Sequence, residues 1–359
     1  HRDLVEKRSC ITEDTYKLSL ALAQIMPGPL AAQVAIAIGY FEGGIAGATL
    51  GGIAFVLPSF LMVVAISLAY VRYGGLWWMQ ALFYAIGATV IAIIAIAAYK
   101  LARGTNKRDP LLWGIFVALT AVTLWAQAEL AEFFILAGVV VLLVRAWPGL
   151  KQGILMALGG VALGLLIWAL EAWLHQTGSA ADSGNVLVQI LLFFTKAGAF
   201  VFGSGLAIIP FLQQGVVQQF GWLNDQQFLD AVAVAMITPG PVVITVAFIG
   251  YIVAGLAGSI LAAIGIFLPV YIFTIVPAPW FKRHRDNPQL KAFVDGATAA
   301  ATGAITGAVL LLTTRAIVDL PTAAIALVSL AILWRYKIPE PIIVSIAGLV
   351  GLVLWPIFH

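Results

Sequence analysis

Apolar and polar positions along the chain predict a series of long helices separated by short polar loops. Apolar runs of roughly 20 residues recur over the whole length, which is what a helix needs to cross a bilayer. Alternating segments of about ten residues, typical of a transmembrane β-barrel, are absent. The apolar runs predict twelve segments, at about 17–41, 45–71, 77–101, 111–127, 130–146, 150–174, 186–212, 227–254, 256–280, 291–313, 321–334 and 338–357. We therefore predict an all-α polytopic membrane protein, because lipid leaves backbone polar groups no partners outside their own helix.

Composition strengthens this prediction and excludes several other classes. The chain of 359 residues is 62% hydrophobic and 10% charged, whereas soluble domains carry about 25% charged residues. A net charge of +3 mainly reports orientation in a membrane protein, so we expect the lipid bilayer and no nucleic acid as a partner. The single cysteine and the spacing of the four histidines match no metal site. We expect neither a metal nor another cofactor.

Two of the predicted segments are interrupted by Pro-Gly-Pro, at 27–29 and at 239–241. Proline lacks an N–H and its ring clashes with the preceding turn, so the sequence ends one helix and starts another. Within a bilayer such a break survives where it is buried or lines a wet cavity. The half-helix that follows presents N–H groups and a partial positive charge, which suit an anion. A kink for packing is the alternative, but paired broken helices in two repeats are typical of transporters.

The two breaks belong to an internal repeat. Residues 27–58 align with 239–269 when one single-residue gap is allowed, and Gly39-Tyr40 then meets Gly250-Tyr251. This pattern predicts a duplicated protein. We assign residues 1–149 to the first repeat, 150–185 to a linking helix and polar linker, and 186–359 to the second repeat.

The repeat extends towards the N-terminus, where Thr12-Glu13-Asp14 falls opposite Asn224-Asp225-Gln226. The second repeat then has an opening helix at about 186–212 that the first repeat lacks. We expect one further N-terminal span in the native protein, which would make thirteen segments.

The number of spans predicts how the two repeats are oriented. If each Pro-Gly-Pro segment crosses once, seven spans separate equivalent points and the repeats are inverted. One face then carries twelve basic residues and the other carries six, so the richer face is expected to be cytoplasmic. The richer face comprises Lys100, Arg103, Lys107, Arg108, Arg145, Lys151, Lys282, Arg283, Arg285, Lys291, Arg335 and Lys337. The poorer face comprises Arg2, Lys7, Arg8, Lys17, Arg72 and Arg315. If the broken segments re-enter instead, parity changes and the split is about eleven to seven or eight. We favour crossing.

Polar and small residues near the breaks are the candidate substrate ligands. Gln33 and Thr245 are repeat equivalents one turn beyond each break. Lys196 lies inside an apolar run, where a cation marks a functional site or snorkels to the interface. Gly203-Ser204-Gly205 is either another helix break with exposed N–H groups or a close-packing face. The predicted substrate-binding residues are Gly28, Pro29, Gln33, Lys196, Gly203, Ser204, Gly205, Thr238, Gly240, Pro241 and Thr245.

Other residues have narrower expected roles. Asp230 and Asp295 lie near apolar sequence and are the better candidates for a proton relay. The glycine series around Gly43 and Gly44, mirrored at Gly255 and Gly258, is expected to permit close helix contact. We assign no chemistry to these glycines.

Several ordered stretches resemble the chromate ion transporter family over nearly the whole chain. They include FGSGLAIIPFLQQGVV and GWLNDQQFLDAVAVAMITPGPV in the second half, and ALAQIMPGPLAAQVAIAIGY in the first. The family pattern also has an FGGP-type motif in the first repeat, which this sequence lacks. The resemblance supports both breaks and 202–205 as site elements, without showing which side chain touches the ion.

The resemblance implies a bacterial multi-pass inner-membrane protein that exports chromate, with repeats of opposite orientation. We expect a secondary transporter driven by a gradient or the membrane potential, because no P-loop is present. Sulfate is expected to compete, as a dianion of similar shape. An oxyanion channel and an importer of a related anion such as sulfate remain alternatives. An integral-membrane enzyme needs clustered ionisable side chains that the sequence lacks, so we predict no enzyme. The oligomeric state is open, with a homodimer as one option.

Overall fold

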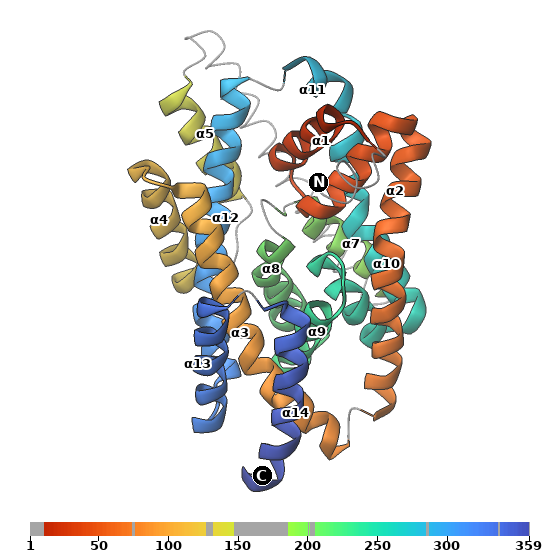
Figure 1. The fold of residues 1–359 in the computed structure, drawn as a ribbon, viewed down its shortest axis with the longest axis vertical. Helices are drawn as coiled ribbons and strands as arrows, with labels where there is room; N and C mark the ends of the chain where they lie inside the picture. The colour runs from red at the N-terminus through yellow and green to blue at the C-terminus, as the bar shows by residue number, and fades with distance from the viewer. Residues whose placement is uncertain are drawn as a thin grey trace.

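A computed structural model describes residues 11–73, 76–126, 132–146, 186–199, 201, 205–284, 287–336 and 338–358, and all its regular elements in these ranges are helical (Figure 1). The predicted linking helix at 150–174 and the polar linker at 175–185 lie outside these residues. The first half contains α1 (Glu13–Ile25), α2 (Leu30–Tyr73), α3 (Trp77–Asn106), α4 (Pro110–Ala126) and α5 (Glu132–Arg145). The second half contains α7 (Val186–Ala199), η2 (Gly205–Ile208), α8 (Ile209–Gln213), η3 (Gln214–Gln219), α9 (Asp225–Ile237), η4 (Val242–Ile244), α10 (Thr245–Ile275), α11 (Ala278–His284), α12 (Pro288–Ala316), α13 (Leu320–Arg335) and α14 (Glu340–Phe358).

Five helical stretches within the described residues are long and apolar enough to cross a membrane. They are Leu30–Tyr73, Trp77–Asn106, Val242–Lys282, Pro288–Thr314 and Glu340–Ile357. The prediction of an all-α polytopic membrane protein is confirmed.

The first Pro-Gly-Pro separates α1 from α2, and α2 itself reverses direction after a few turns. The reversal is at Gly43 (φ −137°, ψ 21°) and Gly44 (φ 60°, ψ −148°). The second of these conformations is essentially restricted to glycine. A Cβ atom at Gly39 would lie 2.2 Å from the carbonyl oxygen of Gly47, so the backbones on either side of the turn touch. The segment 30–42 and the segment 45–73 are therefore two antiparallel helices.

The second Pro-Gly-Pro region has the same design. The direction of α10 reverses at Ala254 (φ −145°, ψ 28°) and Gly255 (φ 62°, ψ −151°). A Cβ atom at Gly250 would lie 2.4 Å from the carbonyl oxygen of Gly258. The prediction of close helix contact is confirmed at Gly47 and Gly258. It is wrong for Gly43, Gly44 and Gly255, which have no atom within 4 Å of a built Cβ and instead form the reversals.

These reversals overturn the expectation that each Pro-Gly-Pro segment crosses once. α1 and α9 have 13 residues each, which is about 20 Å of helix and shorter than the hydrocarbon core. α1 packs against 30–42 through a cluster that includes Leu22 and Ala37, and the chain returns to the end where α1 begins (Figure 1). Each broken segment is thus part of a short helical hairpin whose two ends lie on the same side of the molecule. Lys17 consequently lies at the same end as α11, not opposite it.

The expected single helix at about 186–212 is also wrong. α7 ends at Ala199, and helical structure resumes at Gly205. The chain then runs back along α7, because the ring of Phe193 stacks on Phe211 at a centroid distance of 5.4 Å and lies against Gly215. This region is therefore a third hairpin, with α7 ending at Ala199 in one arm and η2 beginning at Gly205 in the other.

The long helices of the two repeats are interleaved. α4 and α5 pack on α12, while α13 and α14 pack on α3 (Figure 1). Small residues permit these contacts: a Cβ atom at Gly303 would lie 2.4 Å from the carbonyl oxygen of Phe116, and one at Gly351 would lie 2.1 Å from that of Ala81. Helices from each half of the sequence therefore complete a bundle around a long helix of the other half.

The core surrounds α9, whose residues from 228 to 236 are all buried. Side chains of α3, α7 and the first turns of α10 enclose it in one apolar cluster. The second Pro-Gly-Pro break follows directly after this buried helix, so it lies inside the fold and not on a peripheral loop.

Candidate functional site

The tips of the three hairpins meet at Gly205. A Cβ atom at this glycine would lie 3.7 Å from the Cβ atoms of both Pro29 and Val242, and 3.5 Å from Cγ1 of Val243. Pro29 ends the first break, and Val242 follows the second. Three interruptions that are far apart in sequence thus come together at one place.

The two Pro-Gly-Pro breaks also make matching contacts across the repeats. A Cβ atom at Gly28 would lie 3.1 Å from Val270 of α10, and one at Gly240 would lie 2.6 Å from Ser59 of α2. Ser59 and Val270 are equivalent residues, because each follows the aligned Leu-Pro pair. Reciprocal contacts between equivalent positions are the property of a two-fold interface. Each break is therefore held against the long helix of the other repeat.

Gln33 stabilises the first break from within. Its side chain is completely buried, and its Nε2 donates to the carbonyl oxygens of Pro27 at 2.8 Å and Met26 at 3.2 Å. These carbonyls lost their helical donors when the prolines interrupted the helix. Gly28 has φ +145°, and a Cβ atom there would lie 2.6 Å from Nε2 of Gln33. Glycine is therefore required at this position both for its backbone conformation and for space.

The second break is built differently. Thr238 and Thr245 are buried, and each hydroxyl donates to a carbonyl three residues earlier in the sequence, those of Ala235 and Val242. Their hydrogens are thus already engaged. Gly240, with φ +156°, is exposed although the break follows the most buried helix of the fold. An accessible space therefore reaches the second break.

The first turn after the second break begins with backbone N–H groups, of which that of Ile244 bonds to the carbonyl of Pro241. Pro241 precedes η4 and supplies no side-chain cap to it. The first N–H groups of a helical segment have no intrahelical acceptor. They carry a partial positive charge that favours an anion.

The remaining predicted ligands are placed as follows. Gly203 and Ser204 lie outside the described residues. Lys196 is half-buried in the last turn of α7, and its Nζ lies 6.0 Å from the centroid of the Phe211 ring. This distance is within the range of a cation–π interaction. The structure thus places Lys196 beside α8, within the third hairpin.

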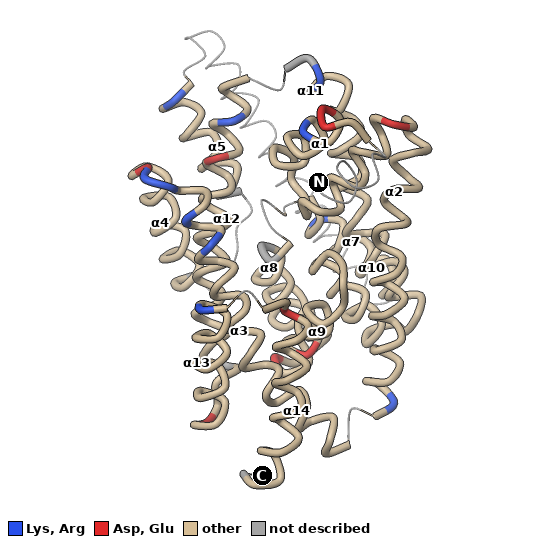
Figure 2. Tube along the Cα trace, in the orientation of Figure 1, with Lys and Arg blue, Asp and Glu red and all other residues tan. Residues whose placement is uncertain are grey.

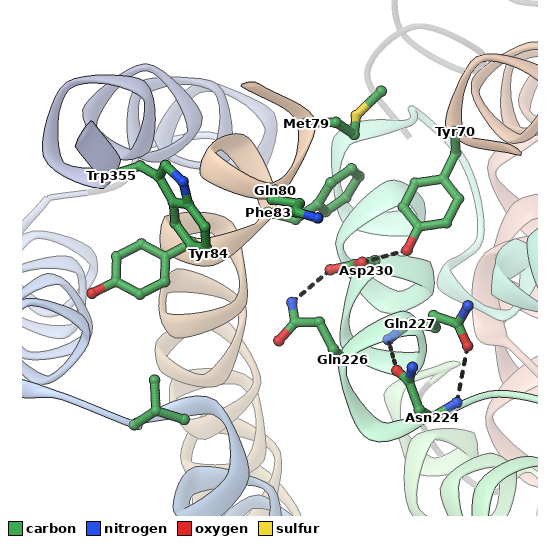
Figure 3. A pocket seen from close by; sticks show the side chains of 11 residues that line it. Tyr70, Met79, Gln80, Phe83, Tyr84, Asn224, Gln226, Gln227, Asp230 and Trp355 are labelled. Carbon is green, nitrogen blue, oxygen red and sulfur yellow. Dashed lines mark hydrogen bonds between the residues drawn. The ribbon is translucent and has the colours of Figure 1, made fainter. Parts of the chain in front are cut away.

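A cavity of about 390 Å³ lies between the start of α9 and the ends of α2 and α14. Asp230, with 3% of its surface exposed, accepts hydrogen bonds from Tyr70 Oη at 2.7 Å and from Gln226 Nε2 at 2.9 Å (Figure 3). Sequence reasoning singled out Asp230 but missed Tyr70, which is 160 residues away in the chain. The repeat alignment could have indicated Tyr70, because this position near the end of the apolar α2 is a tyrosine in the first repeat and a phenylalanine, Phe281, in the second. The cavity is lined by Tyr70, Met79, Gln80, Phe83, Tyr84, Asn224, Gln226, Gln227, Asp230, Val318 and Trp355.

Asp295, the other proton-relay candidate, is part of an ion-pair group. Arg145 Nη1 lies 3.3 Å from Asp295 Oδ2, and Arg145 also pairs with Asp109. These side chains are about one third exposed. They join α4, α5 and α12, so their arrangement is that of a partly solvated structural contact.

Basic residues are unevenly distributed over the molecule. Figure 2 shows most Lys and Arg towards the end formed by α1, α5 and α11, and few towards the end formed by α14 and the start of α13. The cavity that contains Asp230 lies towards the second, less basic end.

Comparison with known proteins agrees with this architecture. The sequence pattern of the family described as "Chromate transporter" matches residues 1–165 and 188–352. A chromate transport protein of Cupriavidus metallidurans is 56% identical over 100% of this chain and 88% of the relative. A probable chromate transport protein of Synechococcus elongatus is 52% identical over 99% of this chain and 89% of the relative. An uncharacterised transporter of Methanocaldococcus jannaschii is 27% identical over 80% of this chain and 72% of the relative. No solved structure matches this chain.

The matched residues cover both repeats, and they include both Pro-Gly-Pro breaks, all three hairpins and Asp230. The resemblance recognised in the sequence motifs is confirmed, and with it the duplicated organisation of the chain. This multi-pass membrane protein belongs to the chromate transporter family.

Proposed function

We propose that this protein is a secondary transporter that exports chromate across the bacterial inner membrane. The names of two relatives, each more than half identical to this chain, support the substrate. The main structural support for a substrate-binding site is that the three hairpin tips meet at Gly205. Interrupted helices from two repeats that meet inside the fold are where secondary transporters bind their substrates.

The chemistry of the meeting point favours an anion. The helical segments that follow Pro29 and Pro241 both begin there, and their first N–H groups lie towards the tips. The exposed Gly240 lets a small ion approach the backbone of the second break. A dianion at this point is stabilised by both helix N-termini. Such backbone donors select an anion by its charge and shape. Sulfate is a dianion of similar shape, so it competes with chromate.

We further propose that the two repeats are inverted, with Gly205 near the middle of the membrane. Three observations support this orientation. Equivalent residues make reciprocal contacts at the breaks, α2 ends at the start of α3 while α10 leads to α11 at the other end (Figure 1), and basic residues gather at one end (Figure 2). The positive-inside rule makes the end with α5 and α11 cytoplasmic. Rocking of one repeat against the other would then expose the tips alternately to each side.

The membrane potential supplies a driving force for export. Each negative charge that leaves a cell with a negative interior gains about 2.3 kcal/mol per 100 mV. The sequence contains no P-loop that would indicate ATP hydrolysis. A dianion such as chromate thus gains twice this energy.

An oxyanion channel is the second candidate, because the exposed second break also fits a fixed pore lining. The test is uptake of labelled chromate into inverted vesicles, with an excess of unlabelled chromate loaded inside. A transporter accelerates entry of label when the inner face is loaded, and sulfate outside reduces it. If the rate of entry of labelled chromate does not depend on the chromate loaded inside, the channel is favoured. Absence of any chromate-dependent flux would overturn both the transporter and the channel.

A further inference from the structure

Asp230 is a buried carboxylate whose partners are neutral. It is 3% exposed, and its two oxygens accept one hydrogen bond each, from Tyr70 and Gln226. Among the described residues that line its cavity, none is Lys, Arg or His. Burying a charge without a charged partner is costly, and an ionisable residue inside a membrane protein marks a functional site.

The side chains around Asp230 and its cavity come from several helices. α2 contributes Tyr70, and α3 contributes Tyr84, whose hydroxyl is hydrogen-bonded to Asp319. α10 contributes Phe248, which packs edge-on against Tyr70 at a centroid distance of 5.0 Å.

Other nearby helices contribute no further titratable group to the cavity lining in the described part of the chain. α14 contributes Trp355, and α12 places no side chain in the lining. On α9 itself, Asp225 accepts from Gln213 of α8 and does not line the cavity. Asp230 is therefore the acidic group of this cavity, and two tyrosines are its titratable neighbours.

The other repeat has no such acid. The equivalents of Asp230 and Tyr70 are Leu18 and Phe281. These two side chains belong to one apolar cluster where α1 meets α11. The same backbone position is thus polar in one repeat and apolar in the other, so the fold does not need the carboxylate.

α9 links this carboxylate to the substrate site. Asp230 lies seven residues before Ile237, which is the last residue of α9 and precedes the second break. Seven residues span about 10 Å of helix. The hairpin tips lie beyond Ile237, and at about 15 Å in a medium of effective dielectric constant about 20 a unit charge still changes the binding of a dianion by tenfold or more.

We propose that Asp230 is a proton-binding site whose occupancy is coupled to the oxyanion at the hairpin tips. This inference rests on the proposed function and deepens it. A proton on Asp230 removes the negative charge that repels the dianion, so it strengthens anion binding. By linkage, the bound anion strengthens proton binding by the same factor. The cavity gives the proton a path from the less basic end of the molecule.

Equilibrium binding of labelled chromate to the reconstituted protein between about pH 5 and pH 9 tests the coupling. Three proteins are compared: wild type, Asp230→Asn and Asp225→Asn. Because chromate itself takes up a proton in this range, the ratio of apparent Kd values between proteins is the readout, and chromate speciation cancels. We expect Asp230→Asn to match wild type at the acidic end and to bind about tenfold more tightly at the alkaline end. Asp225→Asn, on the same helix but outside the cavity, should follow wild type throughout.

A second measurement needs no variant. Chromate mixed with wild-type vesicles in weak buffer at alkaline pH should cause proton uptake beyond that seen with protein-free vesicles. If all three proteins bind chromate with the same pH profile and no extra proton uptake occurs, the proton coupling is overturned while the proposed function stands. Absence of chromate binding to wild type would overturn the proposed function and this inference with it.

Discussion

Around the two Pro-Gly-Pro breaks the repeats share their backbone conformation and differ in their polar side chains. α1 and α9 are both 13 residues long and occupy aligned positions. At the two breaks, Gly28 and Gly240 have φ values of +145° and +156°. At the reversals within α2 and α10, Gly44 and Gly255 have φ values of +60° and +62°. Yet the Gln33 side chain donates to two carbonyls of the first break, whereas the hydroxyl of its equivalent Thr245 donates to Val242 of the preceding turn η4.

This comparison separates what the fold requires from what function adds. Glycine and proline recur where the chain breaks or turns, because few other residues adopt those conformations. The side chains near the turns are free to diverge once the backbone is fixed. At one pair of equivalent positions, the side chains Leu18 and Phe281 form an apolar contact, whereas their counterparts Asp230 and Tyr70 line a polar cavity.

The largest effect on stability is expected from a substitution at the reversal within α2. Gly44→Ala places a Cβ at φ 60° and ψ −148°, and such strain costs about 1–3 kcal/mol. Gly43→Ala is the matched control, since the second repeat already carries Ala254 with nearly the same dihedral angles. We expect Gly44→Ala to lower the apparent Tm clearly and Gly43→Ala to leave it close to wild type. Equal effects of the two variants would contradict the equivalence of the turns.

A smaller difference is expected between the two breaks. Gln33→Leu leaves the carbonyls of Met26 and Pro27 without their side-chain donor, and an unpaired buried acceptor costs about 1–3 kcal/mol. Removal of the unpaired Gln33 Oε1 offsets part of this cost. Thr245→Val loses one hydrogen bond within a helix, worth about 1 kcal/mol. Thermal unfolding in detergent and chromate uptake should both be affected more by Gln33→Leu, and the opposite order would show that the first break is not braced in this way.

The smallest effect is expected where one repeat has a hydrogen bond that the other lacks. Tyr271 Oη lies 2.7 Å from Thr49 Oγ1, and the equivalent of Tyr271 in the first repeat is Phe60. Tyr271→Phe should lower stability by about 0.5–1.5 kcal/mol and leave chromate uptake unchanged. A large loss of uptake would assign this pair a role that the comparison does not give it.

Much of the fold could be predicted from the sequence because apolar length and proline position act locally. The segment predicted at 291–313 corresponds to α12 at Pro288–Ala316, and the one at 321–334 to α13 at Leu320–Arg335. Chain direction could not be predicted. A Gly-Gly pair in an apolar helix suits both close packing and reversal, and the choice depends on the positive φ at Gly44.

The candidate site was predicted in part for a similar reason. The motifs indicate Gly28, Pro29 and Gly205, but the meeting of these residues is a tertiary contact that no local pattern encodes. The cavity at Asp230 depends on Tyr70, which approaches from a distant helix.

We expect the oxyanion to pass the point where the three hairpin tips meet. Labelled chromate uptake by Gly205→Leu, compared with Gly205→Ala, measures whether it does. A Cβ alone makes ordinary contacts of 3.5–3.7 Å with Pro29, Val242 and Val243, so the alanine variant should transport like wild type. The leucine side chain should fill the meeting point and abolish uptake in a protein that still elutes as a folded species. Wild-type uptake by folded Gly205→Leu would show that the oxyanion takes another path.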